Sequence, residues 1–113
     1  MAIRRITPSN GQPGSAPAYY DPETEQDALV RRYVTLSPPP SKKNNPVIIG
    51  ASGHAYPVWS VFLTYKIAGG DVVRAAEEYE HDLSPDQIRA AVRFAELYPD
   101  VVMPYVAPHL AEA

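Results

Sequence analysis

Proline is the residue that most limits where regular structure can form in this chain. Thirteen prolines occur in 113 residues, and eight of them fall within the first 46. Proline lacks an amide donor and disfavours a helical conformation in the residue before it. Residues 7–18 and 37–45 combine proline with Ser, Gly and Asn, a composition that packs no core. The sequence therefore predicts that the packed unit begins near residue 46.

The clearest helix signal begins at Ser84. Its hydroxyl can accept from the first amides, Pro85 suits the first helical position, and Gln87 completes a capping box. Leu83 and Ile88 stand where a hydrophobic staple would close the entrance. Such a cap contributes about 1 kcal/mol. We therefore predict a helix over residues 84–98, entered from a tight turn.

Two more helices and a small β element are predicted upstream. Residues 71–79 form a short helix, and a longer helix follows Pro57 and ends at Gly69-Gly70. The short turn at residues 80–82 between the last two helices gives the frame of a helix-turn-helix. Residues 46–50 and 54–56 are predicted to form two strands of a hairpin.

The flanking segments are predicted to be looser. Asp21 can cap a helix that ends near Arg31-Arg32, and prolines 38–40 then form an extended spacer. Residues 99–113 are apolar but contain Pro104 and Pro108, which predicts an extended arm. A three-helix unit buries only about 60% of its unfolded surface. The arm is expected either to fold back over the helices or to bind another chain.

The predicted fold class is mainly α, with a three-helix helix-turn-helix core, a small β-hairpin, an N-terminal helix and extended arms. Residues 1–45 are predicted to be a proline-rich extension, residues 46–98 the helix-turn-helix domain, and residues 99–113 an extended apolar C-terminal arm.

Charge and composition argue against several classes of function. The net charge of −3 disfavours a globally basic nucleic-acid binder. Residues 1–66 carry seven basic and four acidic side chains (+3), whereas residues 67–113 carry three and nine (−6). The chain has no cysteine, and its three histidines lack the spacing of a metal pair. We expect no enzymatic activity, no cofactor and no metal site. The N-terminus lacks a secretion signal, which predicts a cytoplasmic location without membrane association.

A helical wheel over residues 84–98 separates two faces. The predicted core face holds Ile88, Ala91, Val92, Ala95 and Tyr98. The opposite face carries Asp86, Ala90, Arg93 and Leu97, and is flanked by Arg89 and Phe94. Its cations can meet phosphates, but its acids and apolar groups suit a protein interface. The candidate DNA-binding residues are Gln87, Arg89 and Arg93 on this helix, with Lys42 and Lys43 on the spacer.

Aromatic residues are abundant for so short a chain, and Tyr and Trp serve protein interfaces well. The alternative for the tyrosines near residue 20 is that they pack the N-terminal helix onto its own domain. The candidate partner-binding residues are Arg31, Arg32, Tyr19, Tyr20, Phe94, Leu97, Met103 and Tyr105.

The order of several short motifs resembles a known family. These motifs are Val47-Ile-Ile-Gly50, Tyr56-Pro-Val-Trp59, a glycine-terminated helix, residues 71–79, and residues 83–92. Their order is similar to the small bacterial domain of unknown function 433 family, over roughly the middle half of the chain. The resemblance implies a tri-helical helix-turn-helix. Some members look like VapB-type antitoxins encoded beside a PIN-domain ribonuclease toxin. Residues 50–56 depart from the Gly-Thr-Arg-Ile type turn of that family.

The expected function is therefore that of an antitoxin-like regulatory protein, which binds and neutralises a PIN-type ribonuclease as part of a homo-oligomer and also binds operator DNA. The alternatives are a stand-alone helix-turn-helix transcriptional regulator and a structural homodimer without a toxin. PIN-type active sites are acidic metal-binding clusters. The pair Arg31-Arg32, or Arg4-Arg5, can occupy the cation position of such a cluster by bidentate pairing.

Overall fold

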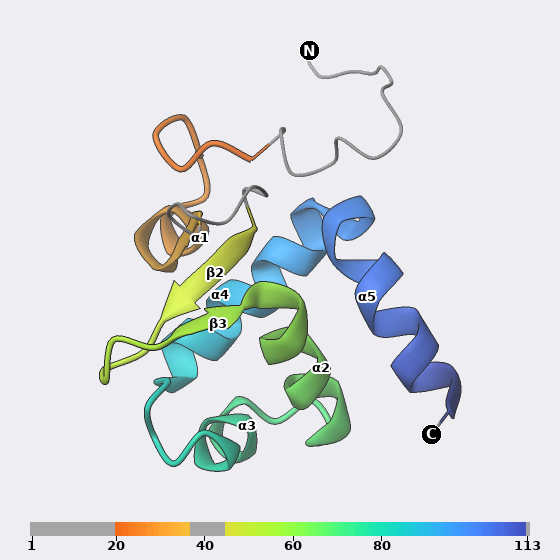
Figure 1. The fold of residues 1–113 in the computed structure, drawn as a ribbon. Helices are drawn as coiled ribbons and strands as arrows, with labels where there is room; N and C mark the ends of the chain where they lie inside the picture. Colours follow the sequence, from red (N-terminus) through yellow and green to blue (C-terminus); the bar gives the residue numbers. More distant parts are fainter. Residues whose placement is uncertain (1–19, 37–44, 113) are drawn as a thin grey trace.

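The computed structural model describes residues 20–36 and 45–112, and this part of the chain is mainly helical (Figure 1). One antiparallel sheet has the strand order β1-β2-β3. The helix α4 is central, because it contacts the four other helices of this part and the strand β1. The mainly α fold with a small β element is confirmed. The elements are α1 (Ala28–Tyr33), β1 (Val34–Leu36), β2 (Pro46–Ile49), β3 (Ala55–Pro57), α2 (Val58–Ile67), α3 (Val72–Glu78), α4 (Pro85–Leu97) and α5 (Pro99–Glu112).

The start of α4 is as predicted. The Gln87 amide donates to the Ser84 hydroxyl at 3.2 Å, and the Ser84 amide donates to the Gln87 side chain at 2.8 Å. The Gln87 side-chain amide also donates to the carbonyl of Ile49 at 2.9 Å. Leu83 is fully buried beside this entrance. The capping side chain therefore also fastens α4 to the end of β2.

The helices α2 and α3 are also confirmed. Asp71 caps α3 by accepting from the amides of Val73 and Arg74. The helix α2 ends before Gly69 and Gly70, whose φ angles are +78° and +79°. Only glycine adopts this left-handed region at little cost, so the glycine pair sets where α2 stops. Pro57 lies one position earlier than predicted, as the N-cap of α2 and the last residue of β3.

Among the described residues, the β element has three strands, one more than predicted. The hairpin of β2 and β3 is confirmed, and β1 adds antiparallel to the other edge of β2, with Val34 opposite Ile48. Both of these side chains are buried. The strand β1 follows α1 without a break and is only three residues long. Its sequence signal is only three residues long and lies just before the proline-rich residues 38–40.

The predicted N-terminal helix was placed too early. Asp27, not Asp21, is the N-cap, and its carboxylate accepts from the amides of Leu29 and Val30. Asp21 instead closes a turn by accepting from the Glu23 amide at 2.9 Å. The buried Glu25 carboxylate accepts from the Asp27 amide at 2.9 Å. The chain before Asp27 therefore makes side-chain hydrogen bonds in place of a helical turn.

Tyr20 belongs to the core. Its side chain is 2% exposed, and its hydroxyl donates to the Val34 carbonyl at 2.7 Å. Its ring meets Phe94 edge-on, with 5.0 Å between the ring centroids. Burial raises the pKa of the Tyr20 phenol, and the nearby carboxylate of Glu25 adds to the effect. One core therefore runs from Tyr20 to α5, and packing is continuous across the predicted boundary at residue 45.

The C-terminal segment is a helix, so the prediction of an extended arm was wrong. Pro104 and Pro108 lie inside α5, and both are exposed. Val102 and Val106 are buried, and each lies two residues from a proline, on the opposite side of the helix. The carbonyls of residues 100 and 104, which lose their helical donors, therefore face solvent and can be hydrated. Prolines on the outer face weaken α5 without removing its apolar face.

Aromatic stacking also attaches α5 to the body. The Trp59 ring of α2 stacks with Tyr105 at 5.6 Å and with His109 at 6.0 Å between centroids. These two residues are four apart, so they lie on one face of α5. In Figure 1, α5 runs beside α2 on the side away from the sheet. The segment covers its own domain, which was one of the two alternatives for it.

The predicted faces of α4 need one correction. Ile88, Ala91 and Ala95 are buried as expected, but so are Ala90 and Phe94, which were placed on the outer side. The helix α1 and Tyr20 cover that side. A central helix has more than one buried face, and a two-sided wheel does not show this.

Candidate protein-binding surface

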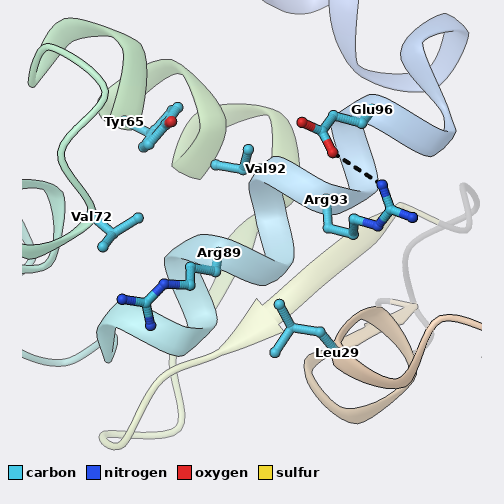
Figure 2. A pocket seen from close by; sticks show the side chains of 7 residues that line it. All are labelled: Leu29, Tyr65, Val72, Arg89, Val92, Arg93 and Glu96. Carbon is cyan, nitrogen blue, oxygen red and sulfur yellow. Dashed lines mark hydrogen bonds and ion pairs between the residues drawn. The ribbon is translucent and has the colours of Figure 1, made fainter.

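An open groove lies along the exposed side of α4 (Figure 2). Its volume is about 370 Å³. In Figure 2, Leu29 of α1 lies on one side of α4, and Tyr65 of α2 and Val72 of α3 lie on the other. The floor consists of Arg89, Val92, Arg93 and Glu96. Their spacing of i, i+3, i+4 and i+7 puts them on one face of the helix. The groove thus has apolar walls and a mostly charged floor.

The arginines on the floor already have partners within the chain. Arg89 pairs with Asp86 at 2.5 Å, and Arg93 pairs with Asp27 at 2.7 Å and with Glu96 at 3.1 Å. Figure 2 marks the bond from Arg93 to Glu96. The hydrogen bond from Arg93 lowers the pKa of the Asp27 carboxyl, and the Val30 amide adds to this shift. Arg93 therefore links α4 to the cap of α1.

The candidate DNA-binding residues on α4 form hydrogen bonds or ion pairs with other residues of the same chain. Gln87 completes the cap and binds the Ile49 carbonyl, while Arg89 and Arg93 are ion-paired. Direct readout of bases needs such groups free to reach base edges. Lys42 and Lys43 lie outside the described residues.

The candidate partner-binding residues fall into three groups. Phe94 and Tyr20 are core residues and are closed to a partner, which corrects the expectation for both. Leu97 and Tyr105 are 39% and 49% exposed, and Met103 is half-buried. Tyr19 lies outside the described residues. Burial of Tyr20 matches the alternative that it packs the N-terminal helix onto its own domain.

Arg31 and Arg32 form an exposed basic pair in the last turn of α1. The Arg32 guanidinium lies 5.2 Å from the centroid of the Tyr33 ring. Within residues 20–36 and 45–112, no ion pair involves either side chain. Arg89 and Arg93, by contrast, form ion pairs with acidic side chains of the same chain. Arg4 and Arg5 are outside the described residues.

Sequence reasoning missed a hydrogen-bonded cluster around Asp82. Its carboxylate accepts from the Ser52 amide, the Ser52 hydroxyl and the Tyr56 hydroxyl, each at 2.7 Å. The Tyr56 hydrogen bond, followed by those from Ser52, lowers the pKa of Asp82, and the same bond raises the pKa of Tyr56. The cluster joins the β2–β3 turn to the α3–α4 turn. A glycine–serine turn and a turn aspartate were its only signals, and sequence alone does not pair them.

The cluster does not have the arrangement of a nucleophile and its base. The Ser52 hydroxyl donates to Asp82, and the His54 backbone amide donates to that hydroxyl at 3.3 Å. The His54 ring instead packs against Tyr56, at 4.5 Å between centroids. Activation of serine would require the imidazole to accept its proton. The geometry is that of a structural clamp.

No group of three His, Asp or Glu side chains in the described part of the chain could hold a metal ion. No helix among those residues has the length and apolar character needed to cross a membrane.

Comparisons with protein-family models, with characterised proteins and with solved structures found no match.

Proposed function

We propose that this chain is an antitoxin-like regulatory protein that binds and neutralises a PIN-type ribonuclease in the cytoplasm. The observation that carries the proposal is the exposed pair Arg31 and Arg32, which forms no ion pair with any acid among the residues that the structure describes. In this proposal α3 and α4 form a helix-turn-helix, as the resemblance to the domain of unknown function 433 family implies. The protein acts by occupying a partner's active site and performs no chemistry of its own.

The chemistry of the basic pair supports such a partner. A guanidinium is always charged and presents a rigid fork of donors that matches a carboxylate. An acidic metal-binding site can therefore take a guanidinium where its cation would bind. Arg31 and Arg32 project from a helix that Asp27 and Arg93 fix to α4, so the scaffold behind them is ordered. Their charges are offset by no acid in the described residues.

Operator binding by α4 has less support. Its polar candidates are used for capping and ion pairing, and Asp86 and Glu96 on its exposed side would repel phosphates. A transcriptional regulator that reads DNA with this helix would have to break these contacts. We therefore place protein binding first and DNA binding second.

Co-expression with the product of the adjacent gene, which the proposal expects to be a PIN-type nuclease, tests the proposal. The wild-type chain should co-purify with that nuclease as a complex of defined mass. The double variant Arg31→Glu/Arg32→Glu should fail to do so. Arg74→Glu/Lys66→Glu is a matched control, because both side chains are exposed and neither forms an ion pair among the described residues. Equal recovery of the nuclease with both double variants would contradict a role for the basic pair.

A further inference from the structure

We propose that the groove over α4 binds a second copy of this chain, with the two α4 helices antiparallel about a two-fold axis. The inference goes beyond the proposed function and uses a different surface. It comes from the order of charges along the floor, which is Arg89, Val92, Arg93, Glu96.

The charge order is complementary to itself in the antiparallel direction. If Val92 of one copy faces Arg93 of the other, Arg89 faces Glu96 and Glu96 faces Arg89. A two-fold interface uses the same patch on both subunits, so one favourable pair is made twice. A parallel arrangement with equal positions facing would instead oppose arginine to arginine. The sequence of the floor therefore selects one occupant and one direction.

The remaining groups in the groove are compatible with this pairing. A two-fold axis that reverses α4 puts the Leu29 walls of the two copies on one side of the interface and the walls made by Tyr65 and Val72 on the other. These side chains are only partly buried in the single chain. Arg93 lies near the axis, but its charge is offset by Asp27 at 2.7 Å. Arg89 and Glu96 are 52% and 60% exposed, so each can turn from its present partner, Asp86 or Arg93, toward the second copy.

Charge-reversal substitutions in the full-length chain test the interface. The wild type should be a dimer by sedimentation. Arg89→Glu and Glu96→Arg should each weaken self-association by at least about tenfold, because each places like charges opposite one another. Mixing the two single variants should restore a one-to-one dimer, since both cross-pairs are then complementary. Arg74→Glu, a charge reversal on α3 outside the groove, should dimerise like the wild type.

A cross-linking variant gives an independent readout. The chain has no cysteine, so Val92→Cys carries a single thiol next to the proposed axis. A short bifunctional thiol reagent should link it into covalent dimers. Val73→Cys, which is exposed on α3 and outside the groove lining, should stay largely unlinked.

Several outcomes would overturn the inference. These are a wild type that remains monomeric at about 100 μM, a dimer indifferent to both single charge reversals, and no recovery on mixing them. Loss of nuclease binding by Arg89→Glu in a monomeric chain would also overturn it, because the groove would then hold the partner. Nuclease binding through Arg31 and Arg32 is measured separately, so either proposal can fail alone.

Discussion

Ser52 and Asp82 are joined by two hydrogen bonds, since one carboxylate accepts from both the amide and the hydroxyl of Ser52 at 2.7 Å. A backbone hydrogen bond connects the same two turns, because the Ala51 amide donates to the Asp82 carbonyl at 2.9 Å. Asp82 follows Glu80 and His81, which have positive φ angles of 53° and 66°. That backbone conformation is sterically unfavourable for residues other than glycine. We infer that the contacts of Asp82 hold this strained turn in place.

The first prediction concerns Asp82 and pH. The Tyr56 and Ser52 hydrogen bonds lower the pKa of Asp82 in the folded state. Its contribution to the free energy of unfolding is therefore present above the ordinary Asp pKa of about 3.9 and is lost as pH falls through the lower folded value. Asp82→Asn should destabilise the protein at neutral pH, and the difference from wild type should shrink below about pH 4.

Urea unfolding at several pH values checks this. Asp100→Asn is the control, because Asp100 is an exposed aspartate in α5 outside the cluster. It should track the wild type at each pH. A difference between Asp82→Asn and wild type that stays constant down to about pH 2 would contradict the assigned cause.

The second prediction concerns Gly50, which lies against the same carboxylate. A Cβ added at Gly50 would lie 2.4 Å from Oδ2 of Asp82 and 3.0 Å from its carbonyl oxygen. Gly50→Ala should therefore lower the free energy of unfolding by about 1–3 kcal/mol.

The cost of Gly50→Ala should be smaller when Asp82→Ala is already present, since the closest contact is then removed. A double-mutant cycle of unfolding free energies measures this coupling. Strictly additive effects would show that the carboxylate is not the obstacle.

Local sequence rules predicted those parts of the fold whose signals lie close together in the chain. The capping box of Ser84 and Gln87 and the glycine pair after α2 each act within a few residues, and both appear as expected. The cluster around Asp82 depends on contacts between residues 30 apart. Nothing in a single sequence pairs such positions.

The third prediction tests whether the core begins at Tyr20. Tyr20→Phe removes the hydroxyl that binds the buried Val34 carbonyl and should cost about 1 kcal/mol. Tyr20→Ala also removes the ring that packs against Phe94 and should cost about 3–5 kcal/mol. Tyr105→Phe is the control, because its side chain is 49% exposed, and it should stay within about 0.5 kcal/mol of wild type. Chemical denaturation of the three variants would refute the assignment if Tyr20→Ala were as stable as the control.

The fourth prediction concerns the two prolines inside α5. Pro104→Ala should return an amide donor to the helix and relieve a backbone clash, raising stability by about 1–3 kcal/mol. Val106→Ala, on the buried side, should lower it by about 2 kcal/mol. Thermal unfolding followed by circular dichroism measures both. An extended C-terminal segment would show neither the gain with Pro104→Ala nor added helical signal.

The errors in the sequence-based predictions share a physical origin. Rules for proline and for helix caps describe the isolated segment, whereas burial of Val102 and Val106 keeps α5 helical despite its prolines. In the same way, α1 begins after Asp27 and not after Asp21, and the Glu25 carboxylate accepts from the Asp27 amide just before it. At the candidate site, Arg31 and Arg32 were named from the sequence as candidate partner-binding residues. The ion pairs of Arg89 and Arg93 were not predicted. Tertiary partners decided each of these cases.

The most direct test of the proposed function uses the product of the adjacent gene, which the proposal expects to be a PIN-type nuclease. That product is titrated with this protein, and cleavage of a fluorogenic RNA is the readout. Wild-type chain and Arg74→Glu should inhibit equally, while Arg31→Glu/Arg32→Glu should need at least about tenfold more protein for half inhibition. Circular dichroism should show that all three are folded alike. Equal inhibition by all three, or none by the wild type, would contradict the account.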